Sequence, residues 1–279
     1  MKLIHHNYGK AKVRVMKLTR TGAQHSLKEL EVSVMLQGDF DASYTRADNR
    51  LVVPTDTMKN TVYALAREKL GTATEEFGLA LGEHFLKTYP QVQRAEIGLS
   101  ERGWERMSVG GQPHMHAFVQ KNTARMFAQV ACARSESSVE SGIEDLLILK
   151  TTGSGFEGYA QDKFTTLTPT KDRIMATKLR ATWAYAKRPA KYSAANGNIL
   201  EAMLAVFADN YSPSVQATLF QMGEAALAAA QEISKVTLAM PNKHCLLVNL
   251  APFGLDNPNE IFVPTDEPHG QIEGTVTRS

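Results

Sequence analysis

Four short polar segments of this chain carry side chains whose types suit chemistry. They are Asn7–Lys10, Pro54–Thr61, the loop that follows Lys150, and Pro241–His244. The first ends in a lysine at the start of a predicted strand, and the second is the polar entrance to a predicted helix. The third contains an aromatic residue and an arginine, and the fourth puts a histidine between two predicted strands. Amines, hydroxyls, guanidinium groups and imidazoles transfer protons or bind polar ligands, so these segments are the first candidates for a site.

Each of these residues also has a structural explanation when it is taken alone. Lys10 fits a solvated lysine at the end of a strand, and Thr55–Asp56 fits the N-cap of a helix. Phe156 fits a loop anchor and Arg173 a surface ion pair, while His244 fits a strand histidine with satisfied hydrogen bonds. Taken singly, none of them supports a function.

Metal and cofactor motifs are weak or absent. His114 and His116 alternate, so in a strand they would share one face, as two metal ligands do. We expect a pair of ordinary strand histidines at a turn, because no cysteine or glutamate pattern supplies a third ligand. The patterns GxxxxGK[ST], GxGxxG after a strand, HExxH and GxSxG do not occur. An enzyme with this sequence therefore needs a chemistry without an obvious cofactor motif.

The composition limits the class of protein. The chain has 279 residues, of which 43% are hydrophobic and 22% charged, so it is neither disordered nor of low complexity. Its 31 Lys and Arg residues against 29 Asp and Glu give a formal charge of +2, which argues against a nucleic-acid binder. Its two cysteines, Cys132 and Cys245, are too few for a disulfide framework, a four-cysteine zinc site or an iron–sulfur cluster.

No segment predicts export or membrane insertion. The N-terminus turns polar at His5, too early for the apolar region of a signal peptide. The most apolar helical stretch, residues 200–208, contains Glu201 and is far shorter than the roughly 20 residues that a membrane span needs. The last residues, Thr277–Ser279, differ from the Ser-Lys-Leu peroxisomal signal. We therefore expect a cytoplasmic protein without a membrane partner.

Hydrophobic periodicity predicts the same order of elements twice, namely two strands, two helices and two strands. The first half is expected to hold strands at 11–20 and 29–36, helices at about 58–70 and from Thr72, and strands at about 95–99 and 114–119. The second half is expected to hold strands at 145–150 and 179–186, helices around 199–207 and from Ser212, and strands at 236–238 and 245–250. In the last helix, Ser212 is the expected N-cap and Pro213 the first helical residue. The pattern predicts an α+β fold with antiparallel sheet, in two domains at 1–138 and 139–279.

Read together, the polar segments resemble the uricase (urate oxidase) family. The resemblance covers nearly the whole chain and is carried, in order, by NYGKAKVRVMKLTR from Asn7, TDTMKNTVYALA from Thr55, FTTLTPTKDRI from Phe164, SPSVQATLF from Ser212, MPNKHCLLVNL from Met240, and the C-terminal PTDEPHGQIEGTVTR. It implies a tandem of two T-fold (tunnelling-fold) domains, each an antiparallel sheet with two helices on one face. It also implies a homotetramer around a tunnel, with active sites shared between subunits.

The resemblance implies roles for ten residues. Lys10, Thr55 and His244 match the family's proton-relay triad. The residues that match its substrate-binding positions are Thr55, Asp56, Phe156, Leu167, Arg173, Val215, Gln216 and Asn242. The residues before position 60 would come from one subunit and the others from its neighbour.

Among the substrate-binding residues, Arg173 and Gln216 would grip the edge of the urate ring, and Phe156 would stack on its face. Val215 and Leu167 would line the plane of the ring. Asp56 would support the polar end of the pocket, and Asn242, with Thr55, would hold dioxygen or a water over the ring. Pro54 departs from the family pattern, but it restricts the residue before it and leaves the N–H of Thr55 free to donate.

The implied reaction is the oxidation of urate by dioxygen and water to 5-hydroxyisourate and hydrogen peroxide, with urate and dioxygen as partners and no metal or flavin cofactor. Such a reaction needs a base, because the urate dianion is a good electron donor. A lysine amine that is desolvated at an interface can accept a proton near neutral pH, and a threonine hydroxyl can both donate and accept one.

Two other readings remain open at the level of the sequence. One is another T-fold enzyme that acts on a purine or pterin, although zinc-dependent versions need ligand sets that two separated cysteines disfavour. The other is a non-catalytic homologue that binds purines but has lost the relay. The presence of all three relay residues argues against the second reading.

Overall fold

The computed structural model describes residues 3–71, 73–121 and 123–278. The chain forms two compact units. Unit 1 consists of residues 1–143 and 184–194, and unit 2 consists of residues 144–183 and 195–279. The predicted domain boundaries, 1–138 and 139–279, rest on the repeated order of elements along the sequence, whereas the two units are defined by their compactness. The predicted division stays a prediction.

An antiparallel sheet forms the centre of unit 1, in the strand order β1–β2–β3–β6, with the first part of β7 beside β6. Its strands are β1 (Tyr8–Thr19), β2 (Ser26–Gly38), β3 (Val92–Arg102), β6 (Arg125–Ala133) and β7 (Ser137–Lys150). One face of the sheet is apolar, since Leu30, Val32, Val34 and Leu36 alternate along β2 and are each 0% exposed. The first two strands, expected from the sequence at 11–20 and 29–36, pair as an antiparallel hairpin.

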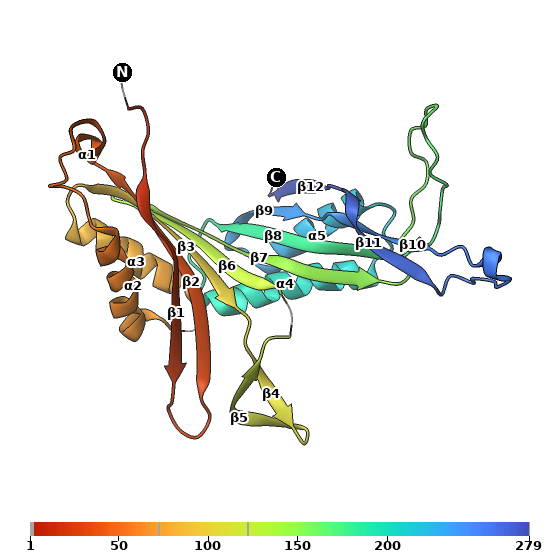
Figure 1. Cartoon of the computed structure of the whole chain (residues 1–279), viewed down its shortest axis with the longest axis horizontal. Helices are drawn as coiled ribbons and strands as arrows, with labels where there is room; N and C mark the ends of the chain where they lie inside the picture. Colours follow the sequence, from red (N-terminus) through yellow and green to blue (C-terminus); the bar gives the residue numbers. More distant parts are fainter. Residues whose placement is uncertain (1–2, 72, 122, 279) are drawn as a thin grey trace. The chain divides into compact units, whose positions relative to one another are not determined.

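Two helices cover this apolar face, α2 (Thr55–Lys69) and α3 (Thr74–Thr88), as Figure 1 shows. α2 packs on β1, and α3 packs on β3 and β6. α3 turns an apolar stripe toward the sheet, since Phe77, Leu81 and Phe85 are each 0% exposed. Thr72, at which this helix was expected to begin, lies outside the described residues. A short helix, α1 (Asp41–Arg46), precedes both and was not expected from the periodicity.

The last strand of this sheet differs from the prediction. The strand expected at 114–119 is β5 (Gln112–Val119), which pairs with β4 (Glu105–Val109) in a separate two-stranded sheet. Its side chains are exposed or only partly buried, so it offers no apolar face to the core. The fourth strand is β6, whose Ala128, Val130 and Cys132 are buried on the side of α3.

A buried carboxylate lies where the β4–β5 hairpin leaves the sheet. Glu29 of β2 is 3% exposed, and the Trp104 indole Nε1 donates to its Oε2 at 2.9 Å. Arg14 binds the other carboxylate oxygen, and Arg102 Nε lies 3.6 Å from it. Burial alone would raise the pKa of Glu29, but the hydrogen bonds from Arg14 and Trp104 hold it below its usual value.

Unit 2 is also built on antiparallel strands with two helices (Figure 1). Beside the second part of β7 its strands are β8 (Met175–Tyr185), β9 (Ile233–Ala239), β10 (Asn242–Leu247), β11 (Phe262–Gly270) and β12 (Glu273–Thr277). Its helices are α4 (Tyr192–Asp209) and α5 (Val215–Ala229), with a short 3-10 turn, η1 (Ala251–Phe253). α5 packs on β9 and β12, and Met203, Met222 and Leu238 are each 0% exposed in the core. The predicted α+β class with antiparallel sheet is confirmed.

The start of α5 differs from the prediction. Ser212 is not the cap, because the helix begins at Val215 and Ser214 is its N-cap. The Ser214 Oγ accepts a hydrogen bond from the Ala217 N–H at 3.1 Å, which satisfies one of the free donors of the first turn. Ser212 Oγ instead accepts a hydrogen bond from Thr218 Oγ1 at 2.7 Å.

No helix in the described part of the chain combines the length and the apolar character that crossing a bilayer requires.

Candidate functional site

Strand β1 carries Lys10 into a closely packed corner of unit 1. The residue before it has to be glycine, because a Cβ on Gly9 would lie 1.8 Å from the carbonyl oxygen of Val34 on β2. Lys10 pairs with Val34, and the register then shifts before the next pair, at a bulge that holds Lys12 at a φ of 57°. Within the described residues the amine of Lys10 has no hydrogen-bond or ion-pair partner. The strand therefore fixes the backbone of Lys10 and leaves its charge available.

Thr55 and Asp56 open α2, but neither acts as its N-cap, so the simple structural explanation for this pair is wrong. Pro54 occupies the N-cap position, and no side chain caps the helix. Both residues are exposed, and the Asp56 carboxylate binds Lys59 and accepts a hydrogen bond from Asn60 Nδ2 at 2.9 Å. These contacts lower the pKa of Asp56, with Lys59 the largest cause and the charge of Lys10 a smaller one. Lys10 and Asp56 are therefore near enough to interact electrostatically.

In unit 2, Phe156 and Arg173 lie together on the long loop between β7 and β8. The backbone of Phe156 pairs with Thr170 through two hydrogen bonds of 2.7 and 3.1 Å. The guanidinium carbon of Arg173 lies 5.4 Å from the centre of the Phe156 ring, and Tyr159 stacks on that ring with an interplanar angle of 12°. A planar cation and two stacked aromatic rings thus lie together on one loop, groups that bind flat polar ligands.

The Arg173 side chain is half-buried and incompletely satisfied. Its Nε is buried and has no hydrogen-bond partner among the residues that the structure describes, although buried polar atoms in proteins are nearly always paired. Burial lowers the pKa of Arg173 without making the group neutral, because a guanidinium stays protonated throughout the ordinary pH range. A charged donor without a partner is suited to an acceptor supplied by a ligand.

Asp172, next to Arg173, fastens this loop. Its carboxylate accepts hydrogen bonds from Thr152 Oγ1, at 2.9 and 3.0 Å, and from the Gly153 N–H at 2.8 Å. The Thr152 hydroxyl and backbone donors, including those of Gly153 and Ser154, hold the pKa of Asp172 below its usual value. The sequence motif includes Asp172, but nothing in the pattern alone assigns it this anchoring role.

Two backbone hydrogen bonds join the same loop to the start of α5. Gly155 N donates to Ser212 O, and Ser212 N donates to Gly153 O, each at 2.8 Å. Ser212 lies three residues before Val215, which is buried, and four before Gln216, which is exposed. We call this hydrogen-bonded group the clamp loops. It comprises the loop between β7 and β8, which carries Phe156 and Arg173, and the start of α5, which carries Val215 and Gln216.

The other predicted residues of unit 2 lie at or beyond the edge of this group. The backbone carbonyl of Leu167 accepts from Tyr159 Oη at 2.5 Å, and the Leu167 side chain is exposed. Asn242 and His244 lie on β10, where Asn242 pairs with Thr177 and His244 with Thr265. Both β10 side chains are partly buried, and neither forms a hydrogen bond to the clamp loops among the residues that the structure describes.

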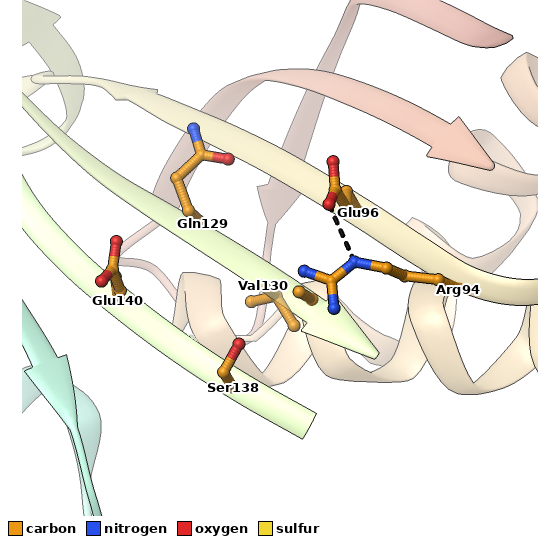
Figure 2. A pocket seen from close by; sticks show the side chains of 7 residues that line it. Arg94, Glu96, Gln129, Val130, Ser138 and Glu140 are labelled. Carbon is orange, nitrogen blue, oxygen red and sulfur yellow. Dashed lines mark hydrogen bonds and ion pairs between the residues drawn. The ribbon is translucent and has the colours of Figure 1, made fainter. Parts of the chain in front are cut away.

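A separate hollow of about 310 Å³ lies on the sheet of unit 1, over β3, β6 and β7. Figure 2 shows its polar lining by Arg94, Glu96, Gln129, Ser138 and Glu140. The charge of Arg94 is already paired, since its Nε lies 2.9 Å from Glu96 Oε1. None of the predicted site residues lines this hollow.

The predicted reading of His114 and His116 as ordinary histidines fits their contacts. His114 Nδ1 accepts hydrogen bonds from the backbone N–H groups of His116 and Ala117, at 3.3 and 3.1 Å. The His116 ring also lies against that of His25, with ring centres 5.9 Å apart. Over the described residues, no group of three or more His, Cys, Asp or Glu side chains has the geometry of a metal site.

Comparison with known proteins connects these local features to one family. The uricase family model matches residues 6–131 and 139–273. The uricase of Arthrobacter globiformis is 42% identical over 271 residues, which cover 97% of this chain and 88% of that protein. The uricase of Dictyostelium discoideum is 39% identical over 281 residues, covering 99% and 98% of the two chains. The crystal structure of the Arthrobacter globiformis uricase superimposes with a TM-score of 0.94 and 41% identity, over all of this chain and 96% of that one. The predicted tandem of T-fold domains is thereby confirmed, and the chain belongs to the uricase family.

Proposed function

We propose that the chain oxidises urate with dioxygen and water, giving 5-hydroxyisourate and hydrogen peroxide. The observation that carries this proposal is the half-buried Arg173, whose Nε has no partner and whose guanidinium lies 5.4 Å from the centre of the Phe156 ring. Urate is a flat anion edged with carbonyl oxygens and ring nitrogens. It therefore matches both the unsatisfied donor and the aromatic face beside it.

The clamp loops would hold the ring. Arg173 offers a planar fork that can donate two parallel hydrogen bonds to one edge of urate. Gln216 carries both a donor and an acceptor, so it can bind an adjacent N–H and carbonyl pair. Phe156 adds stacking, worth about 0.5–1.5 kcal/mol beyond the buried area. Val215 and Leu167 would line the plane of the ring.

Lys10, Thr55 and His244 would move the protons. Lys10 would accept a proton from urate through the Thr55 hydroxyl, which can donate and accept at once, while His244 exchanges protons at the far end of the relay. Asp56 would support the polar end of the pocket. The absence of a side-chain cap on α2 leaves the first-turn N–H groups, including that of Thr55, free for a ligand.

The reaction would run in steps that balance without a further oxidant. Removal of a proton gives the urate dianion, which transfers electrons to dioxygen and forms a peroxide at ring carbon C5. Water then replaces the peroxide: the bond from C5 to the peroxide breaks, a bond from C5 to the water oxygen forms, and the peroxide leaves as hydrogen peroxide with one proton from the water and one from the relay. Urate is thereby oxidised and dioxygen reduced. Asn242, with Thr55, would hold dioxygen or the attacking water over the ring. In this scheme the protein supplies binding and a base, and neither a metal nor a flavin takes part.

The proposed residues are divided between the two units, which suits a site shared between subunits of a homotetramer. Lys10, Thr55 and Asp56 belong to unit 1, and the remaining seven belong to unit 2. Strands β10 and β11 and the segment between them also expose apolar side chains that an assembly would cover, among them Leu246, Leu247, Phe253, Ile261 and Val263. A cytoplasmic location stays a prediction.

Loss of the urate absorbance band, followed in chelator-treated buffer with and without dioxygen, tests the reaction. We expect dioxygen-dependent loss of urate with one equivalent of hydrogen peroxide, and elemental analysis without a stoichiometric metal. Binding of urate without turnover would support the non-catalytic reading, and turnover of another purine or a pterin alone would support a different T-fold enzyme.

Mixing two inactive variants tests the shared site. Lys10→Met should mainly lower kcat, and Arg173→Ala should mainly abolish binding. If each site takes Lys10 from one chain and Arg173 from its neighbour, half of the randomly formed pairs are mixed, and each mixed pair has one intact site in two. About a quarter of all sites should then recover after subunit exchange. Confirmed exchange without recovery of activity would show that each site lies within one chain.

A further inference from the structure

Tyr8 makes an unusual pair of hydrogen bonds in unit 1. Its hydroxyl accepts a hydrogen bond from the Val53 N–H at 2.7 Å and donates one to the Val53 carbonyl at 3.2 Å. One side chain from β1 thus satisfies both backbone groups of a residue that is 45 positions away in the chain. Val53 is 1% exposed, and buried backbone groups without partners are costly, so these two bonds constrain its backbone.

The positions of the two residues give this contact its significance. Tyr8 lies two residues before Lys10 on β1, and Val53 lies two residues before Thr55, the first residue of α2. Between Val53 and Thr55 stands Pro54, which has a φ of −58° and restricts the conformation of Val53. The orientation of Val53 is therefore passed to Thr55 through a stiff link.

The Tyr8 ring is itself held in place. It packs edge-to-face on Phe40, with ring centres 4.9 Å apart, and Phe40 is 1% exposed. Next to it, Gly9 lets β1 approach β2 so closely that a Cβ would meet the Val34 carbonyl oxygen. Burial is the largest cause that raises the pKa of Tyr8, so the hydroxyl keeps its proton and its ability to donate.

We propose that Tyr8 is a positioning residue for the Lys10–Thr55 pair, because its hydroxyl fastens the segment that opens α2 to the strand that carries Lys10. The inference rests on the proposed function, in which these two residues pass a proton. Tyr8 acts through them and does not touch urate. A relay that depends on hydrogen-bond distances is sensitive to such a contact, since displacement by about 1 Å can cost roughly 100-fold in rate.

Tyr8→Phe is the direct test, because it keeps the ring on Phe40 and removes only the hydroxyl. We expect kcat for urate to fall about 10- to 100-fold, with KM changed by less than about three-fold, since the clamp loops are untouched. The matched control is Tyr192→Phe, which removes the hydroxyl of another tyrosine of unit 1, one that is 2% exposed. The control should keep kcat within about two-fold.

A double-mutant cycle separates positioning from a general structural role. If Tyr8 acts through Thr55, Tyr8→Phe should cost little further activity in a Thr55→Ala background. Additive losses, or unchanged kcat in Tyr8→Phe alone, would overturn the inference. If the wild-type protein oxidises urate and Tyr8→Phe does so equally well, only the inference fails, whereas a wild-type protein inactive on urate removes the proposed function.

Amide hydrogen exchange tests the contact independently of activity. Tyr8→Phe should speed exchange at residues 53–58 relative to Tyr192→Phe, and unchanged exchange there overturns the inference whatever the substrate is. Should Tyr8→Phe not fold, 3-fluorotyrosine at position 8 preserves the shape and lowers the phenol pKa. Because a phenolate cannot donate to the Val53 carbonyl, the alkaline loss of kcat should then begin at lower pH. An alkaline limb that does not move would also overturn the inference.

Discussion

Replacing Arg173 by lysine tests the proposed clamp while keeping its charge. Arginine presents several N–H donors in a rigid plane, whereas lysine presents one tetrahedral ammonium on a flexible chain. The difference is large at this position, because the Arg173 Nε is buried without a partner among the described residues and the guanidinium lies over the Phe156 ring. An ammonium at this position can keep one contact with the urate edge but cannot make two parallel ones.

The size of the effect follows from the loss of one charge-assisted hydrogen bond in a half-buried place. Such a bond contributes about 1.5–3 kcal/mol, which corresponds to a roughly 10- to 150-fold weaker complex. The contact between the flat guanidinium and the Phe156 ring is lost as well. We therefore expect an effect in the upper part of this range. Because the clamp holds the ring in both the ground state and the transition state, most of the loss should appear in KM and less in kcat.

Steady-state kinetics with urate, together with anaerobic binding of urate, measure this effect. The control is Arg180→Lys, which changes an exposed arginine of β8 in the same unit and should leave both constants within about two-fold. If Arg173→Lys has the same KM and kcat as the wild-type protein, the guanidinium does not grip urate. The assignment of the clamp loops as the urate-binding half would then be wrong.

Three further substitutions, together with one control substitution, test the framework of the protein. Gly9→Ala should lower the melting temperature sharply and abolish activity, because the added Cβ would lie 1.8 Å from the Val34 carbonyl oxygen. The control is Gly197→Ala, where the added Cβ would meet no neighbouring side chain or strand within 4 Å. It should stabilise α4 by about 0.5–1 kcal/mol in thermal unfolding. The pKa of Asp172 is lowered in the folded protein, so its stabilisation is complete above its usual pKa of about 4 and disappears as the pH falls through the folded value. Denaturant titrations should show a flatter dependence on pH below about 4 in Asp172→Asn, together with a higher KM for urate. Glu29→Ala should cost about 1.5–3 kcal/mol and lower the melting temperature by roughly 3–10 °C in calorimetry, and an unchanged value would show that its arginine and indole contacts contribute nothing.

The sheet positions were predictable from the sequence where one face is buried. The alternation at Leu30–Leu36 predicts β2, and the structure confirms it with every second residue in the core. The same rule misplaced the fourth strand of unit 1. Residues 114–119 have a strand pattern but no buried face, whereas β6 carries small residues such as Ala128 and Cys132 that fit beneath α3 and give little hydrophobic signal. Hydrophobic periodicity therefore predicts a buried strand poorly when small residues make up much of its buried face.

For the site, residue types and motifs predicted which residues could take part. They did not predict the tertiary contacts that hold those residues in place. Thr55 fits an N-cap by type, yet Pro54 takes that position and leaves Thr55 exposed. Tyr8 and Asp172 lie inside the motifs that carry the resemblance, but their contacts join residues 45 and 19 positions apart and are decided by tertiary packing. No local rule of the sequence reports such contacts.

In each half of the proposed site, a neighbour of a candidate residue has its polar groups satisfied by hydrogen bonds, whereas the Lys10 amine and the Arg173 Nε have no partner among the described residues. Tyr8 uses its hydroxyl entirely on Val53, and Asp172 uses its carboxylate on Thr152 and the backbone that follows it. By contrast, the Arg173 Nε is buried without a partner. Loss of a satisfied neighbour removes native hydrogen bonds and should lower both stability and activity. Loss of an unsatisfied group removes no native hydrogen bond, so Arg173→Ala should lose activity while keeping, or slightly raising, the free energy of unfolding. Activity and the free energy of unfolding should therefore be compared for variants of the satisfied neighbours and for variants of the unsatisfied groups. The comparison separates the residues that bind and react from those that position them.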